Sequence, residues 1–155
     1  LMKKILLLIV VVLSSCYVDD IDYFPIESNI TEFEAVLLDS INNYRASINL
    51  LELKSDTLAQ SVARKHCQYM IDNDKISHDN FSKRVIFLQD YGADKVGETV
   101  GYGFGTPSGF LYGYLNSPSH KAVLERDYYT HIGVIVLKNK IGRNYNVLIF
   151  VNYKD

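Results

Sequence analysis

Two runs of strand-forming residues near the C-terminal end restrict the fold most strongly. Residues 132–137 and 145–151 are rich in β-branched, aliphatic and aromatic side chains, which favour an extended backbone. The polar residues 138–144 between them suit a hairpin loop. Most of the chain before them has helical periodicity. Helices first and strands later predict an α+β domain with an antiparallel sheet covered by helices.

Capping and turn signals divide the part of the chain before the hairpin. Thr31 and Glu34 have the spacing of a capping box, and apolar residues follow at intervals of three and four. The expected elements are a helix over 31–47, a loop over 50–54, a helix from Ser55 or Asp56 to about 71, a helix over 81–91, a strand over 95–102, a helix from Pro107 to about 116 and a last helix after Ser117-Pro118.

The first residues indicate export. Lys3 and Lys4 precede an apolar run over 5–13, followed by Leu13-Ser14-Ser15-Cys16. A basic start, a short apolar run and small residues at a cleavage site are typical of a secretory signal peptide, and the run is too short to span a bilayer as a helix. The cysteine after the small residues resembles a bacterial lipobox, which implies a diacylglyceryl group on Cys16. The alternative is an ordinary secretory signal with an incidental cysteine.

These signals set the expected domain boundaries and location. We expect a signal peptide over 1–15, an acidic tether over 16–30 and one folded domain over 31–155, which is near the commonest domain size. The membrane is then a partner through lipidated Cys16, and the protein belongs to the bacterial cell envelope. Asp19 and Asp20 shortly after the cysteine favour the outer membrane, on its periplasmic face or at the cell surface.

Charge and cysteine content exclude some classes of function. Without the signal peptide the chain has 14 basic and 18 acidic residues, and no basic stripe suggests a nucleic-acid partner. If Cys16 is acylated, Cys67 has no partner for an intrachain disulfide. Cys67 falls within a helical pattern, which favours a buried structural cysteine over a catalytic thiol.

Three separated polar residues are the main candidates for a functional site. His78 lies in an expected loop, Glu98 in the expected strand over 95–102, and His120 early in the last helix. Two imidazoles and a carboxylate are good ligands for zinc or another divalent cation. They can also polarise a water, with Glu98 as the candidate catalytic residue. The alternative is that the three brace the fold through hydrogen bonds without binding anything.

Other residues give weaker signals. His66 lies on the apolar face of the second helix, where a packed or surface histidine is commoner than a metal ligand. Glu125 and His131 flank the last helix and a strand, so they are secondary candidates for lining the same cleft, with surface positions as the alternative.

The ordered set of motifs resembles the bacterial CAP-domain (SCP-like extracellular) proteins. The resemblance covers about 33–153 and is carried by Leu38-x-x-Ile41-Asn42-x-x-Arg45, Leu58-Ala59, Ala63, Met70, Ser77-His78, Gly97-Glu98, Ser117-Pro118-Ser119-His120 and Ile132-Gly133-Val134. It implies an α-β-α sandwich with a cleft lined by two histidines and acidic residues, which binds zinc or another divalent ion in some members. His78, His120 and Glu98 match those cleft residues.

Three positions depart from the family pattern. Thr99 stands where the family usually has Asn, Tyr114 where it usually has Trp, and the second acidic residue of many relatives falls at or near Ser117. The resemblance therefore implies a set of three cleft residues rather than four. Fewer ligands mean weaker metal binding or binding completed by water.

We expect an exported binding protein whose cleft engages a small ligand, a lipid or an envelope protein. The alternative is a peptidase or esterase that uses a metal-bound water or a Glu98–His pair, although neither a nucleophile elbow nor a His-Glu-x-x-His helix is present. A third interpretation is a structural envelope protein. The candidates for an exposed aromatic binding surface are Tyr102, Phe104, Phe110, Tyr112 and Tyr114. Exposure of Tyr102, Phe104 and Tyr112 together beside His120 would favour ligand binding, and burial of all three would favour core and rim packing.

Overall fold

The computed structural model describes residues 30–153. The expected signal peptide, Cys16 and the tether up to residue 29 lie outside the described residues. Within residues 30–153, no helix is both long and apolar enough to cross a bilayer.

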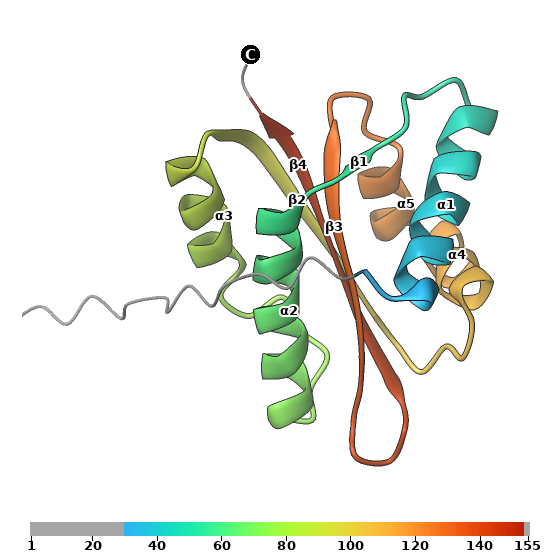
Figure 1. The fold of residues 1–155 in the computed structure, drawn as a ribbon, viewed down its shortest axis with the longest axis vertical. Helices are drawn as coiled ribbons and strands as arrows, with labels where there is room; N and C mark the ends of the chain where they lie inside the picture. The colour runs from blue at the N-terminus through green and yellow to red at the C-terminus, as the bar shows by residue number, and fades with distance from the viewer. Residues whose placement is uncertain (1–29, 154–155) are drawn as a thin grey trace, which may run out of the picture.

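The described chain forms five helices and four strands (Figure 1). In chain order they are α1 (Glu32–Ser47), β1 (Lys54–Ser55), α2 (Thr57–Asp72), α3 (Phe81–Asp90), β2 (Ala93–Tyr102), α4 (Pro107–Leu115), α5 (Pro118–Leu124), β3 (His131–Lys138) and β4 (Asn144–Tyr153). The expected helices, the strand that carries Glu98 and the C-terminal hairpin are confirmed, with bounds that differ by a few residues.

The sheet has the strand order β1-β3-β4-β2. β4 pairs antiparallel with both β2 and β3, as expected. The prediction of a loop over 50–54 was wrong at its end, because β1 adds to the sheet parallel to β3. Lys54 N donates to Thr130 O and Asp56 N to Ile132 O. The sheet is therefore mixed rather than purely antiparallel. The sequence did not predict β1, because a strand of two residues is too short to show a period.

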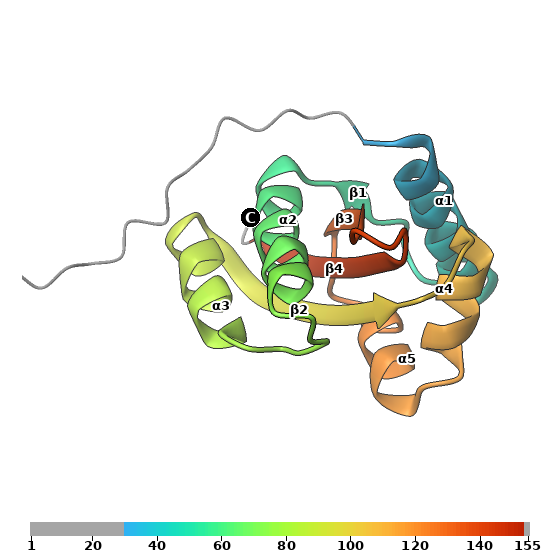
Figure 2. The same cartoon turned by 90° about the horizontal axis from the view of Figure 1, so that it is seen from below.

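Helices cover both faces of the sheet (Figure 2). α2 and α3 lie on one face, and α1, α4 and α5 lie on the other. Each face buries its own apolar cluster, one around Cys67 and Val147 and the other around Phe110 and Phe150. The expected α-β-α sandwich is confirmed. β2 is an outer strand of this sheet, so side chains from both helical layers can meet along its edge.

Local contacts fix the helices that carry the site. Thr31 and Glu34 form the expected capping box at the start of α1, and Glu34 also accepts from Val136 N of β3 at 2.8 Å through its other oxygen. Asp56 caps α2 through Ala59 N. These bonds hold α1 and α2 in place against opposite faces of the sheet.

α2 approaches β3 very closely at Gly133. A Cβ atom added there would lie 2.3 Å from the carbonyl carbon of Ala59 and 2.3 Å from Gln60 N. Only glycine leaves room for helix backbone at this distance. The helix that carries His66 and Cys67 is thereby seated directly on the sheet.

Cys67 is a buried residue of this interface, as predicted. Its side chain has no exposed surface, and its thiol lies 3.4 Å from Tyr145 O. Burial raises the pKa of the thiol to about 12, so it remains protonated at neutral pH.

Candidate functional site

Glu98 lies on the edge strand β2 and is the centre of a polar cluster. Its side chain is only 1% exposed, yet three basic side chains surround it from α2, α3 and the loop between them. A buried carboxylate requires such partners, because removing a charge from water is costly.

Arg84 of α3 is the strongest of these partners. Its Nε donates to Oε2 of Glu98 at 2.8 Å and its Nη2 to Oε1 at 2.8 Å. Two parallel charge-assisted bonds of this kind fix both the position and the orientation of a carboxylate. Arg84 Nη1 also donates to the backbone carbonyl of Asp79 at 2.7 Å, which ties the preceding loop to the same centre.

His78 comes from the loop between α2 and α3, as predicted. Its Nδ1 lies 2.8 Å from Oε1 of Glu98, while half of its side chain is exposed. Since a carboxylate accepts, Nδ1 carries the proton and Nε2 keeps its lone pair when the ring is neutral. The geometry therefore presents the second ring nitrogen of His78 away from Glu98.

His66 of α2 braces this loop from behind. It is 3% exposed, its Nε2 donates to Ser77 O at 2.7 Å, and the same nitrogen lies 3.8 Å from Glu98 Oε1. Burial lowers the pKa of His66, although the charge of Glu98 partly opposes this. The expectation of a packed histidine is confirmed, and the residue positions the neighbour of His78.

His120 approaches the same region from the other helical layer. It lies in the first turn of α5, and its ring meets Tyr114 edge-on with centroids 5.4 Å apart. Burial lowers the pKa of His120, and the nearby His78 lowers it further. His78 belongs to the loop that precedes α3, and α3 and α5 contact β2 from opposite faces of the sheet (Figure 2), so both histidines belong to elements at this edge strand.

The cluster offers a metal ion fewer than three protein ligands. No group of three or more His, Cys, Asp or Glu side chains within residues 30–153 is arranged to hold one. Glu98 already has both oxygens bonded to Arg84 and His78. The ring nitrogens of His78 and His120 are the atoms left without a carboxylate or backbone partner in the described part of the chain, apart from His78 Nδ1, which faces Glu98.

The secondary candidates lie elsewhere. Glu125 accepts a hydrogen bond from the hydroxyl of Tyr44 and raises the pKa of that phenol to about 12. His131 bonds Thr130 Oγ1 through Nδ1 at 2.8 Å and meets the ring of Tyr153. Neither residue contacts Glu98, so the structure does not bring them into the cluster.

The three positions that depart from the family pattern differ in their surroundings. Ser117 occupies the N-cap position of α5, but its hydroxyl meets only Ser119 Oγ, at 3.3 Å. Tyr114 is buried and donates to Asn146 Oδ1 while it supports the ring of His120. Thr99 is fully buried beside Glu98 in the chain.

The aromatic candidates divide into exposed and buried residues. Tyr102, Phe104 and Tyr112 are 36%, 37% and 69% exposed, while Phe110 and Tyr114 are buried. Phe104 packs over Phe110 with ring centroids 5.3 Å apart. In the described part of the chain the only ring packed against His120 is that of buried Tyr114, so the expectation of an exposed aromatic surface beside His120 stays a prediction.

Arg84 is the site residue that sequence reasoning missed. The sequence has many basic residues on its expected helices, and nothing in the pattern around Arg84 sets it apart. The available signal was indirect, since a glutamate within a strand expected to be largely buried needs a cation nearby. Which cation fills that place depends on how α3 packs against β2.

The fold, with helices on both faces of a sheet of strand order β1-β3-β4-β2 and a His78–Glu98 pair at its edge strand, is that of a known class of protein. The chain belongs to the CAP family, because the family model described as the cysteine-rich secretory protein family matches residues 38–153.

Individual relatives agree with this assignment. The structure is similar to an outer surface protein of Borrelia burgdorferi, with 26% identity and a TM-score of 0.73, over 81% of this chain and 96% of that one. It is also similar to an extracellular SCP-domain protein of Bacillus anthracis, with 26% identity and a TM-score of 0.68, over 77% of this chain and 40% of that one.

The curated relative is longer. The uncharacterized membrane protein YlbC of Bacillus subtilis is 30% identical over an alignment of 121 residues that covers 74% of this chain. The match spans only 34% of that protein. These relatives are described as outer surface, extracellular or membrane proteins, which agrees with the expected location outside the cytoplasm.

Proposed function

We propose that this chain is an exported binding protein of the bacterial cell envelope. Its cleft at His78, Glu98 and His120 binds a small ligand, a lipid or an envelope protein, with a divalent cation as a bridge where one is present. The proposal goes beyond family membership, which defines the fold and the location of relatives but no ligand.

One observation carries the proposal. Arg84 and His78 together occupy both oxygens of Glu98, so the carboxylate is neutralised and held rather than free to attack or to take a proton. The exposed part of the cluster is then the imidazole of His78, with His120 nearby. An imidazole can accept a hydrogen bond or bind a metal ion when it is neutral, and can bind an anion when it is protonated.

The cluster can supply two protein ligands to a divalent cation. His78 Nε2 and His120 would hold the ion, and Glu98 would orient His78 as a carboxylate commonly does behind a metal-bound histidine. Zinc or a similar ion would supply a Lewis acid with open positions. Water or a donor group of a bound partner would fill them.

A hydrolase is the second candidate, and the His78–Glu98 hydrogen bond is the observation in its favour. A carboxylate that orients an imidazole through Nδ1 is the arrangement of a general base. In that case His78 Nε2 takes the proton and Glu98 acts as a positioning residue. Glu98→Gln should then abolish turnover of a peptide or ester without unfolding, and unchanged turnover would reject this role.

We also propose that a lipid group on Cys16 anchors the protein to the membrane of the cell envelope. The lipobox-like sequence and the surface or membrane descriptions of the relatives support it, and dual or triple acylation gives stable anchoring. Cys16→Ala should abolish incorporation of labelled palmitate and release the protein from the membrane fraction. Membrane retention of this variant would contradict the lipid anchor.

Calorimetric titration of zinc into the metal-stripped protein with Cys16→Ser tests the cleft. The expected result is saturable binding that His78→Ala and His120→Ala each weaken by at least about tenfold, because each removes one of two ligands. His131→Ala is the matched control, since His131 lies outside the cluster. Equal heats in all four proteins would remove the cation from the proposal.

A further inference from the structure

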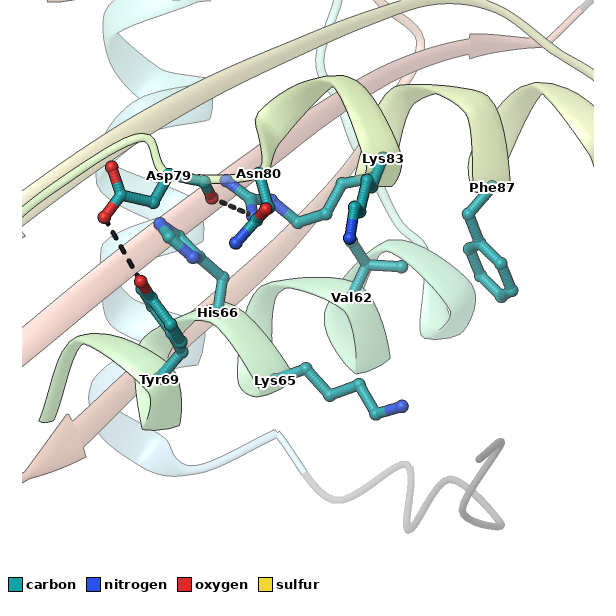
Figure 3. A pocket seen from close by; sticks show the side chains of 9 residues that line it. Val62, Lys65, His66, Tyr69, Asp79, Asn80, Lys83 and Phe87 are labelled. Carbon is teal, nitrogen blue, oxygen red and sulfur yellow. Dashed lines mark hydrogen bonds between the residues drawn. The ribbon is translucent and has the colours of Figure 1, made fainter. Parts of the chain in front are cut away.

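A second site lies behind the cluster, in a pocket of about 240 Å³ between α2 and α3 (Figure 3). The pocket is lined by α2 on one side and by α3 with its preceding loop on the other, through Val62, Lys65, His66, Tyr69, Asp79, Asn80, Lys83, Arg84 and Phe87. In Figure 3, Val62, His66 and Tyr69 point from α2 toward α3, whereas Lys65 extends away from α3. The volume corresponds to about eight waters of liquid. It therefore suits a ligand with one ring and a small polar group.

The charges in the pocket are not balanced within it. Asp79 pairs with Lys75 at 2.9 Å, and Arg84 is committed to Glu98. Lys65 and Lys83 have no ion-pair partner among residues 30–153. In Figure 3, Lys83 reaches from α3 toward α2, so its ammonium group lies between the two helices. The pocket thus holds spare positive charge.

Two further polar side chains line the pocket and have hydrogen-bonding atoms that no described group uses. Asn80 occupies the N-cap position of α3, but its side chain makes no capping bond there and no other hydrogen bond to the described part of the chain. His66 uses Nε2 for Ser77 O, and no described group donates to its Nδ1. An amide donor beside the N-terminus of α3 adds to the preference for a negative group, since that end of a helix is partly positive.

The remaining walls are apolar. Val62 and the ring of Phe87 face the pocket at its end away from Asp79, and Tyr69 lines it near Asp79 (Figure 3). The pocket therefore has an apolar end, and an end with a lysine ammonium group and an amide. It matches a molecule that has an apolar ring at one end and a negatively charged group at the other. A ligand with only one of these features would leave half of the pocket unused.

We propose that this pocket binds a small aromatic carboxylate, with the ring between Val62 and Phe87 and the carboxylate at Lys83 and Asn80. The pocket is separate from the cleft at His78 and His120. Arg84 and His66 belong to both, because they line the pocket and also support Glu98 and the loop that carries His78. Its ligand chemistry does not depend on a metal ion or on the proposed function of the cleft.

Benzoate is the probe for this proposal, with acetate and benzyl alcohol as matched compounds that lack the ring or the charge. A protein-observed NMR titration should give saturable binding of benzoate with a Kd on the order of 1 mM, as expected for so few atoms. Amides around Asn80 and Phe87 should shift. Acetate and benzyl alcohol should bind at least about tenfold more weakly.

Variants separate this site from the rest of the surface. Lys83→Met and Phe87→Ala should each weaken benzoate at least about fivefold, while Lys140→Met, an exposed lysine in the β3–β4 loop, should leave it unchanged. Circular dichroism checks folding, and Lys83→Gln replaces Lys83→Met if the latter unfolds. The double variant His78→Ala/His120→Ala should bind benzoate normally even where it has lost zinc.

Three results would overturn the proposal. They are the absence of saturable benzoate binding at tens of millimolar, equal binding of acetate and benzoate, and equal benzoate affinity in the Lys83 variant and the wild type. None of these results bears on zinc binding at the cleft, so the two proposals fail independently.

Discussion

Arg84 of α3 holds both carboxylate oxygens of Glu98 on β2, with Nε 2.8 Å from Oε2 and Nη2 2.8 Å from Oε1. Through its third nitrogen the same guanidinium bonds the carbonyl of Asp79. One side chain therefore connects the edge strand, α3 and the loop that carries His78. The position of His78 depends on an ion pair that is almost completely buried.

Arg84→Met should destabilise the fold strongly, because it leaves the buried carboxylate of Glu98 without its cation. We expect a loss of about 3 kcal/mol in the free energy of unfolding, measured by urea denaturation. Adding Glu98→Gln should recover part of the loss, since no charge is then left unpaired. Arg64→Met, on the exposed side of α2, is the control, and an equal loss in that variant would contradict the role of the ion pair.

Gly133→Ala should also destabilise the protein, for a steric reason. The new methyl group would meet the backbone of α2 at Ala59 and Gln60, which cannot move without shifting the whole helix. The expected loss is at least about 2 kcal/mol. Gly105→Ala, where an added Cβ has nothing within 4 Å, should change stability little. A thermal melt that is the same for both variants would show that α2 is not seated as described.

Acid should weaken the fold through His66. Its pKa is lowered by burial from 6.5, so the unfolded chain takes up a proton before the folded protein does. The free energy of unfolding should therefore fall as the pH drops from about 6.5 toward the folded pKa, and this contribution should be constant above that range. His66→Gln keeps a donor for Ser77 O and does not titrate. Its stability should fall less between pH 7.5 and about 5.5, and an equal fall would contradict the assignment.

The thiol of Cys67 should be unreactive in the native state. It is fully buried with its pKa raised to about 12, and reagents such as Ellman's attack only an accessible thiolate. In a Cys16→Ser protein, we expect negligible labelling at neutral pH and one reactive thiol after addition of urea. Rapid stoichiometric labelling without denaturant would mean that α2 opens readily from the sheet.

The sequence predicted the parts of this molecule that depend on local patterns. Capping at Thr31, the helical period of α2 and the strand composition of β3 and β4 each reflect interactions within a few residues. The places of His78, Glu98 and His120 on a loop, a strand and an early helical turn followed from the same signals.

The parts that escaped prediction depend on tertiary packing. β1 has only two paired residues, and its partner β3 lies more than 70 residues further along the chain, so its parallel pairing leaves no local pattern in the sequence. Arg84 was missed because its partner is 14 residues away on another element. Glu98 was expected to be a ligand or a catalytic group, and the position of α3 adds Arg84 as a cationic partner that the sequence did not reveal.

Long-range proton–nitrogen NMR of the imidazoles during a zinc titration tests the account of the cleft most directly. Before zinc, His78 should carry its proton on Nδ1, toward Glu98, and should have an unprotonated Nε2. Zinc should then shift Nε2 of His78 and one nitrogen of His120 together, with no change at His66 or His131. A His78 protonated on Nε2, or a titration that leaves both cleft histidines unchanged, would contradict the account.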